Sequence, residues 1–246
     1  MQKQCSRLRF GTVLLIFTGS DKIMSSTETK AVSCPQCNYE NHVTVYKTIN
    51  GSTDGKAIKE KMLSGELFRF KCEKCGHEAM LKYPVLYNDI DKKFMVFYIP
   101  EIDRTSAVDK NLEKEYAYEE LNDITRRLAG SFNEFKEKVH IFESGLDDRA
   151  MEIAKVALYD VVSKRTGEEV KGGYFSKYSE KDGTIGFTFF VGEENQIYVQ
   201  TTRIEIYKKS AEIADNYKED TGRKFVLVNR DWARNVLYVY KKKNEQ

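Results

Sequence analysis

The chain lacks several signals that mark membrane proteins and the commoner classes of enzyme. No apolar run reaches the roughly 18 residues from which a transmembrane helix is recognised. The three histidines, His42, His77 and His140, form no HExxH pattern, and no glycine-rich motif of the phosphate-binding type is present. We therefore predict that the protein does not span a membrane and is not an enzyme.

An excess of charge of one sign is also missing. The formal net charge is +2, and because residues 1–23 alone carry +3, the chain from Met24 onward carries −1. Nucleic-acid binding depends on lysines and arginines that neutralise phosphates, so this balance argues against a strong interaction. A local basic patch remains at Arg69, Lys71, Lys74 and Lys82. Nucleic-acid binding is thus an alternative function, and we expect it to be weak.

What the chain does contain is two C-x-x-C pairs, Cys34 with Cys37 and Cys72 with Cys75, separated by 34 residues. We refer to the first pair as the first hook and to the second pair as the second hook. Zinc binds four thiolates in a tetrahedron, and a complete shell of four protein ligands is typical of structural rather than catalytic sites. We predict one structural Zn²⁺ per chain, bound by Cys34, Cys37, Cys72 and Cys75.

The residue that follows each hook favours the turn that such a site needs. A left-handed residue after the second cysteine lets backbone N–H groups point toward sulfur, and glycine or asparagine adopts this conformation most readily. Asn38 and Gly76 occupy these positions, and Pro35 fixes the backbone angle φ inside the first hook. One C-x-x-C pair alone is a weak signal, whereas two pairs with these neighbours are a strong signal for a metal site.

Two other roles of paired cysteines fit less well. Disulfides need an oxidising compartment and are typical of proteins with small cores. This chain has an odd number of cysteines, five, and is long enough to bury a large core. A thioredoxin-like redox pair opens a helix, but strand-like alternation follows both Cys37 and Cys75. His77 is a spare ligand that four thiolates leave unused, and Cys5 stands alone.

Residues 1–30 are predicted to be an N-terminal extension. Basic residues precede an apolar run at 10–17, which resembles a signal peptide, yet no clear small-residue cleavage site follows. We expect Met24 to be the true start, followed by a polar lead-in at 25–30, and we expect a cytoplasmic protein. A signal peptide is the alternative, although export would tend to oxidise the four cysteines.

Beyond residue 30 the hydropathy pattern indicates an α+β fold. Residues 31–100 are predicted to form a zinc ribbon with a helical insertion at 56–63, residues 101–170 a helical part that begins with a charged linker, and residues 171–246 a small α+β module. The expected strands are 42–49, 67–71, 78–86, 93–99, 124–128, 174–179, 185–191, 196–202 and 224–228. The other expected helices are 131–143, 146–165, 203–217 and one that begins near Asp231.

Carboxylates gather at the start of the helix expected at 146–165. Asp147, Asp148 and Glu152 are the side chains most suggestive of an acid–base site. Acidic residues are common at helix N-termini, however, because they interact favourably with the positive end of the helix dipole. We therefore interpret these three carboxylates as structural, and an enzyme that uses them is the second alternative function, after nucleic-acid binding.

Three further runs accompany the hooks: YPVLYND at 83–89, FMVFYIP at 94–100 and IFESGLDDR at 141–149. Together with the hook sequences CPQC and CEKCG, they resemble the CpXC-domain proteins of bacteria and archaea over roughly residues 31–165. The second hook has Glu73 where the name-giving proline of that family would stand. The resemblance implies a metal-binding ribbon module and no particular activity. We expect a zinc-binding protein that acts on protein partners, as an interaction or regulatory module.

Overall fold

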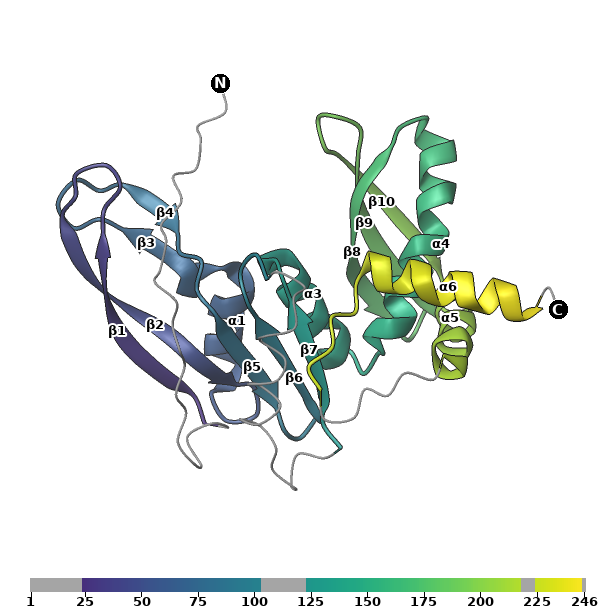
Figure 1. The fold of residues 1–246 in the computed structure, drawn as a ribbon, viewed down its shortest axis with the longest axis horizontal. Coiled ribbons are helices and arrows are strands. Elements are labelled where there is room, and N and C mark those ends of the chain that lie inside the picture. Colours follow the sequence, from purple (N-terminus) through teal and green to yellow (C-terminus); the bar gives the residue numbers. More distant parts are fainter. Residues whose placement is uncertain (1–23, 103–122, 218–223, 245–246) are drawn as a thin grey trace. The chain divides into compact units, whose positions relative to one another are not determined.

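A computed structural model describes residues 24–102, 123–217 and 224–244 (Figure 1). Contacts between Cα atoms divide the chain into two compact units, Met1–Ser131 and Phe132–Gln246. Residues 1–23 and most of the predicted charged linker lie outside the described residues, and so do the expectations that concern them. In the described ranges, no helix is both long and apolar enough to cross a membrane.

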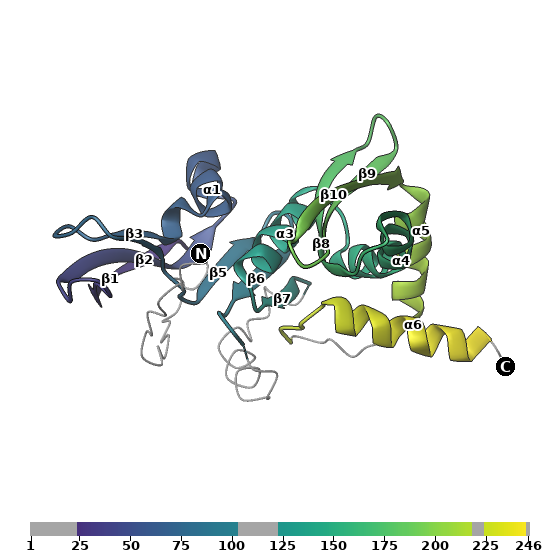
Figure 2. The same ribbon diagram turned by 90° about the horizontal axis from the view of Figure 1, so that it is seen from above.

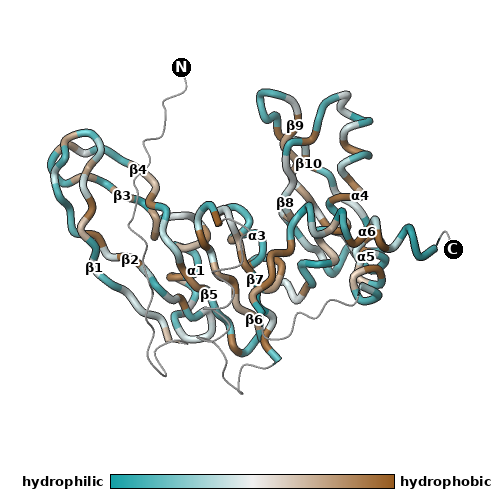
Figure 3. Tube along the Cα trace, viewed as in Figure 1, coloured by the Kyte–Doolittle hydropathy of each residue, from teal (hydrophilic) through white to brown (hydrophobic). Residues whose placement is uncertain are grey.

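The first unit is built on a five-stranded mixed sheet in the order β1-β2-β5-β6-β7. Its strands are β1 (Ser26–Ser33), β2 (Glu40–Asn50), β5 (Val85–Asp89), β6 (Phe94–Tyr98) and β7 (Thr125–Ala129). The pairs β1–β2 and β5–β6 are antiparallel, whereas β2–β5 and β6–β7 are parallel. Every residue of β5 and β6 is buried, and the hydrophobic stretch of β6 marks the core of this unit (Figure 3).

The connection from β2 to β5 carries the first helix and a small second hairpin. The helix α1 (Gly55–Ser64) lies at the predicted helical insertion, and Gly65 ends it in the left-handed conformation with a φ of 82°. A short helix, η2 (Glu66–Phe68), leads into the antiparallel pair β3 (Arg69–Lys71) and β4 (Glu78–Met80). These two strands form a separate two-stranded sheet.

The second unit combines helices with an antiparallel meander in the order β10-β9-β8. Its elements, in chain order, are α3 (Phe132–Glu143), α4 (Asp148–Thr166), β8 (Val170–Ser179), β9 (Thr184–Val191), β10 (Gln196–Arg203), α5 (Glu205–Asn216) and α6 (Arg230–Asn244). The helix α4 lies against one face of this sheet (Figure 2), where Leu158, Phe187 and Phe189 belong to the buried core. A smaller apolar cluster around Ile153 and Ala233 joins α4 to α5 and α6.

The predicted α+β class is confirmed, but several predicted elements are wrong. Residues 26–30 of the expected polar lead-in are part of β1, which pairs with β2 along its whole length. The strand expected at 78–86 is interrupted between β4 and β5, where Pro84 has no N–H to donate to a ladder. Residues 224–228 form no strand, and Val226 makes an isolated bridge there.

The boundary between the units falls inside the segment 101–170 that the sequence pattern treats as one helical part. The strand β7 pairs with β6 and therefore belongs to the sheet of the first unit. The helices α3 and α4 instead pack with β8 in the second unit. The division thus falls where the pattern changes from the strand expected at 124–128 to the helix expected at 131–143, inside a segment predicted as one part.

Candidate metal centre

The two hooks lie in the turns of two hairpins. Cys34 and Cys37 are in the turn between β1 and β2, and Cys72 and Cys75 are in the turn between β3 and β4 (Figure 1). The four Sγ atoms all lie within 4.8 Å of one another. The fold therefore brings together the four cysteines that the sequence predicts as ligands.

The distances between the Sγ atoms are close to those of four thiolates arranged tetrahedrally around one metal ion. The Sγ atoms of Cys34 and Cys75 are 3.6 Å apart, and so are those of Cys37 and Cys72. Four sulfurs placed tetrahedrally about 2.3 Å from zinc would be roughly 3.8 Å apart, whereas a disulfide needs about 2.05 Å. Cys34 and Cys72 are buried, Cys37 is half-buried and Cys75 is exposed. These four free thiols are positioned to hold one metal ion.

Both hooks have the same backbone geometry. In the first hook, the N–H of Cys34 donates to the carbonyl of Tyr39 and the N–H of Asn38 donates to the carbonyl of Cys34, each at 2.9 Å. The second hook repeats both hydrogen bonds at 2.9 Å, between residues 38 positions later in the chain. Asn38 and Gly76 have φ angles of 54° and 70°, which confirms the predicted left-handed residue after each hook. The hooks are two copies of one local structure.

The thiols of the second hook differ in acidity. Desolvation disfavours the Cys72 thiolate, but hydrogen bonds from the N–H groups of Cys75 and Lys74, together with those of the Cys34 thiol and the Asn41 amide, lower the pKa of Cys72 to about 6. The N–H of His77 favours the Cys75 thiolate, but partial desolvation and the neighbouring thiols raise the pKa of Cys75 to about 12. One cysteine thus loses its proton readily while another retains it. A bound cation would favour the thiolate form of both.

Asn41 is a residue of the site that sequence patterns do not reveal. It is the second residue of β2 and is buried, and its Nδ2 lies 3.7 Å from Cys72 Sγ. A polar residue at an inward position of a strand is the one sequence signal that could have drawn attention to it. His77, the spare ligand, contributes its backbone carbonyl and is not among the four clustered side chains. Cys5 lies outside the described residues.

The basic patch predicted within residues 69–82 is partly neutralised. Lys71 Nζ lies 3.2 Å from a carboxylate oxygen of Glu78, and Lys82 Nζ lies 3.0 Å from one of Glu101. Exposed ion pairs of this kind add little stability, but each places an acidic group beside a lysine that would otherwise attract phosphate.

Asp147, the first of the three suggestive carboxylates, is the N-cap of α4. Its side chain accepts the N–H of Arg149 at 2.8 Å and also pairs with the guanidinium of the same residue at 2.7 Å. Its own N–H donates to the hydroxyl of Tyr207 at 2.9 Å. Capping of a helix by an aspartate satisfies an N–H group that has no partner within the helix, so this side chain has a structural role.

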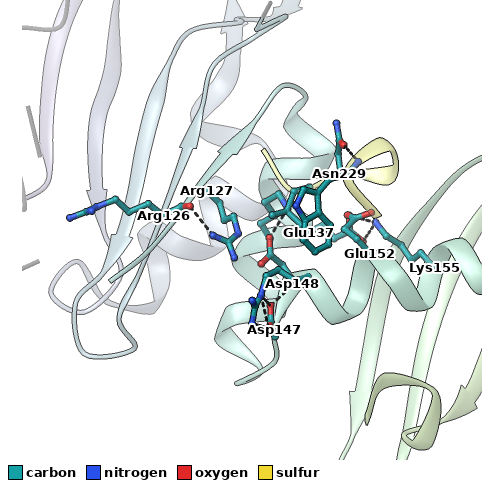
Figure 4. Close-up of polar contacts among 12 residues, drawn as sticks. Arg126, Arg127, Glu137, Asp147, Asp148, Glu152, Lys155 and Asn229 are labelled. Atoms are coloured by element: carbon teal, nitrogen blue, oxygen red, sulfur yellow. Dashed lines mark hydrogen bonds and ion pairs between the residues drawn. The ribbon is translucent and has the colours of Figure 1, made fainter. Parts of the chain in front are cut away.

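The other two carboxylates belong to buried ion pairs, one between α3 and α4 and one within α4 (Figure 4). Asp148 lies 2.8 Å from Lys138 Nζ, and both side chains are at most 2% exposed. Glu152 lies 2.8 Å from Lys155 Nζ, which also contacts Glu137 at 2.8 Å. These contacts agree with the interpretation of the acidic cluster as structural.

Comparison with known proteins places the hooks in a family context. Residues 32–155, half of the chain, match the model of a family described as CpXC protein. This range contains both hooks and ends within α4. No curated protein and no solved structure matches the chain.

Proposed function

The chain belongs to the CpXC protein family, and we propose that it is a zinc-binding protein with a structural four-cysteine site that serves as a protein-interaction or regulatory module. The observation that carries the proposal is the set of four Sγ atoms within 4.8 Å of one another. In this proposal the two hairpins form a zinc ribbon, with α1 as a helical insertion between the hooks.

The choice of zinc and of a structural role follows from the ligand set. Soft thiolates select zinc, copper(I) and iron over hard cations, and four thiolates at tetrahedral spacing are typical of zinc or of iron–sulfur chemistry. Four protein ligands also fill the coordination shell, so the metal has no open position for a water molecule or a substrate. A site of this kind contributes its binding free energy to folding.

A protein partner is supported by the side chains that surround the hooks. Tyr39 and Met80, each within five residues of a cysteine, are 40% and 44% exposed. Lys74 Nζ lies 6.0 Å from the centre of the Tyr39 ring. Tyrosine and methionine are enriched in protein–protein interfaces, where lysine is depleted from the centre. The two exposed side chains therefore favour a protein surface as the ligand of this end of the first unit.

Nucleic-acid binding is the alternative function and has less support. An aromatic ring next to a lysine is a combination that also binds single-stranded nucleic acid. The ion pairs of Lys71 with Glu78 and of Lys82 with Glu101 reduce the local positive charge, however. Because affinity for phosphates grows with the number that are neutralised, we rank this function second.

Metal analysis of the full-length chain tests the zinc proposal. We expect about one zinc per chain in the wild type and most of it lost in Cys34→Ser and in Cys72→Ser, because each removes one of four ligands. Cys5→Ser is the matched control, since Cys5 belongs to neither hook, and it should retain full zinc. A different metal in the wild type, or full zinc in both hook variants, would refute the proposal.

A further inference from the structure

We infer that Asn41 is a positioning residue of the metal centre, and that it compensates for the absence of proline in the second hook. This inference rests on the proposed zinc site. It concerns how the chain holds the two hooks together rather than which side chains bind the metal.

The amide of Asn41 reaches both hooks. Its Nδ2 donates at 3.0 Å to the carbonyl of Tyr39, which also accepts the N–H of Cys34 in the first hook, and lies 3.7 Å from Cys72 Sγ. Its Oδ1 accepts the N–H of Glu73, the second residue of the second hook, at 2.9 Å. Because an N–H must face the oxygen and a carbonyl must face the NH₂ group, these partners fix the orientation of the amide.

The near symmetry of the hooks explains why only one of two equivalent positions, 41 and 79, carries an amide side chain. The residue 38 positions before Glu73 is Pro35, which has no N–H to satisfy. The residue 38 positions after Asn41 is Ala79, which has no side-chain hydrogen-bonding group. Pro35 has no N–H, so the equivalent position of the other hairpin, Ala79, needs no acceptor. Glu73 has an N–H, and the amide oxygen of Asn41 accepts it.

The positions of Asn41 and Ala79 in their strands are equivalent as well. Asn41 is the pairing partner of Val32 across β1–β2, and Ala79 is the partner of Phe70 across β3–β4. Asn41 is 2% exposed, and an amide is costly to bury unless its polar atoms have partners. Its side chain contacts Cys72 and Glu73 of the second hook and Tyr39, two residues after the first hook, so the structure assigns Asn41 to the metal centre.

A double-mutant cycle tests the compensation. We would load the wild type, Asn41→Leu, Glu73→Pro and the double variant with cobalt(II) and measure the rate of metal transfer to a chelator. Leucine has the same branched arrangement of side-chain heavy atoms as asparagine but no polar atoms. Glu40→Gln is the control, since this neighbouring side chain is exposed and should leave the rate unchanged.

We expect Asn41→Leu alone to accelerate metal release about tenfold or more, as loss of a partner outside the ligand shell typically does. In the Glu73→Pro background, Asn41→Leu should accelerate metal release only a few-fold, because residue 73 then has no N–H that needs an acceptor. The sulfur-to-cobalt charge-transfer absorption should shift in both Asn41→Leu proteins, because each loses the N–H next to Cys72 Sγ. A residue that merely supported the fold would not shift this absorption.

Three results would overturn the inference: equal acceleration by Asn41→Leu in both backgrounds, an unchanged charge-transfer absorption, or loss of metal binding in Glu73→Pro alone. The last result would show that the second hook does not tolerate the proline of the first. If instead the wild type bound cobalt without a four-thiolate spectrum, the proposed zinc site would fail, and the two failures are thereby distinguished.

Discussion

Lys155 holds Glu137 by both carboxylate oxygens, at 2.8 and 2.9 Å from its Nζ, in the interior of the second unit. Glu152 lies 2.8 Å from the same Nζ, and Glu137 also accepts the N–H of Phe175 at 2.6 Å. The three charged side chains are at most 7% exposed. One ammonium group thus keeps two buried carboxylates together, although their like charges repel each other.

We expect Lys155→Met to lower the free energy of unfolding of the second unit by about 3–5 kcal/mol, because it leaves two buried carboxylates without their cation. Urea unfolding followed by circular dichroism measures this change. Lys171→Met is the matched control, since Lys171 also pairs with two glutamates, Glu169 and Glu193, but at the surface. A similar loss in both variants would contradict a special role of the buried cluster.

Metal binding should release fewer than four protons per chain at pH 8. The pKa of Cys72 is lowered to about 6, so this cysteine is already a thiolate at pH 8, whereas the raised pKa of Cys75 means that its proton must leave. As the pH falls through 6, Cys72 takes up a proton and metal affinity should decrease. Calorimetry in two buffers of different ionisation enthalpy counts the protons, and release of all four would show that Cys72 has an ordinary pKa.

Under the proposed protein-interaction function, the double variant Tyr39→Ser/Met80→Ser should lose the proposed protein partner. These two side chains are the large exposed hydrophobic residues nearest to the hooks in the chain. Ile197→Ser/Val199→Ser is the matched control, because these β10 side chains are 69% and 63% exposed and lie in the other unit. Quantitative mass spectrometry after affinity capture from native cells compares the three proteins. Equal recovery of every co-purified protein would count against this surface.

Nucleic-acid binding should be weak at physiological salt, with dissociation constants no tighter than roughly the micromolar range typical of non-specific binding. The chain from Met24 onward carries a net charge of −1, and a zinc ion with four thiolates would add a further −2. Gel-shift assays at about 150 mM salt measure the affinity. A nanomolar complex that Lys71→Glu/Lys74→Glu abolishes would raise nucleic-acid binding above the protein-partner function.

The cluster of four cysteines could be predicted from the sequence because its signals are local. In each hook the C-x-x-C spacing identifies the candidate ligands, and the following residue, Asn38 or Gly76, indicates the turn. Neither signal depends on the rest of the fold. The role of Asn41 could not be predicted in this way. Its partner Glu73 is 32 residues away, and the contact exists only once two hairpins have been brought together.

The strand β1 was missed for a different reason. Of its eight residues only Val32 is buried, so β1 lacks the alternation of apolar and polar residues by which strands are recognised. It pairs with β2 through backbone hydrogen bonds at the edge of the sheet, and such pairing is compatible with almost any side chain. In the same way, the apolar run at 224–228 resembles a strand, although Phe225 and Val228 are buried without pairing in a sheet.

The placement of the hooks in two different sheets has a consequence for chain entropy. A two-stranded sheet such as β3–β4 is marginally stable on its own, and the 34 residues between the hooks form a long loop. A metal ion held by both hooks closes that loop, as a disulfide would, and a cross-link over this length restricts the unfolded chain by on the order of 3–4 kcal/mol. Unlike a disulfide, the proposed metal cross-link would form under reducing conditions and would be reversed by removing the metal rather than by electron transfer.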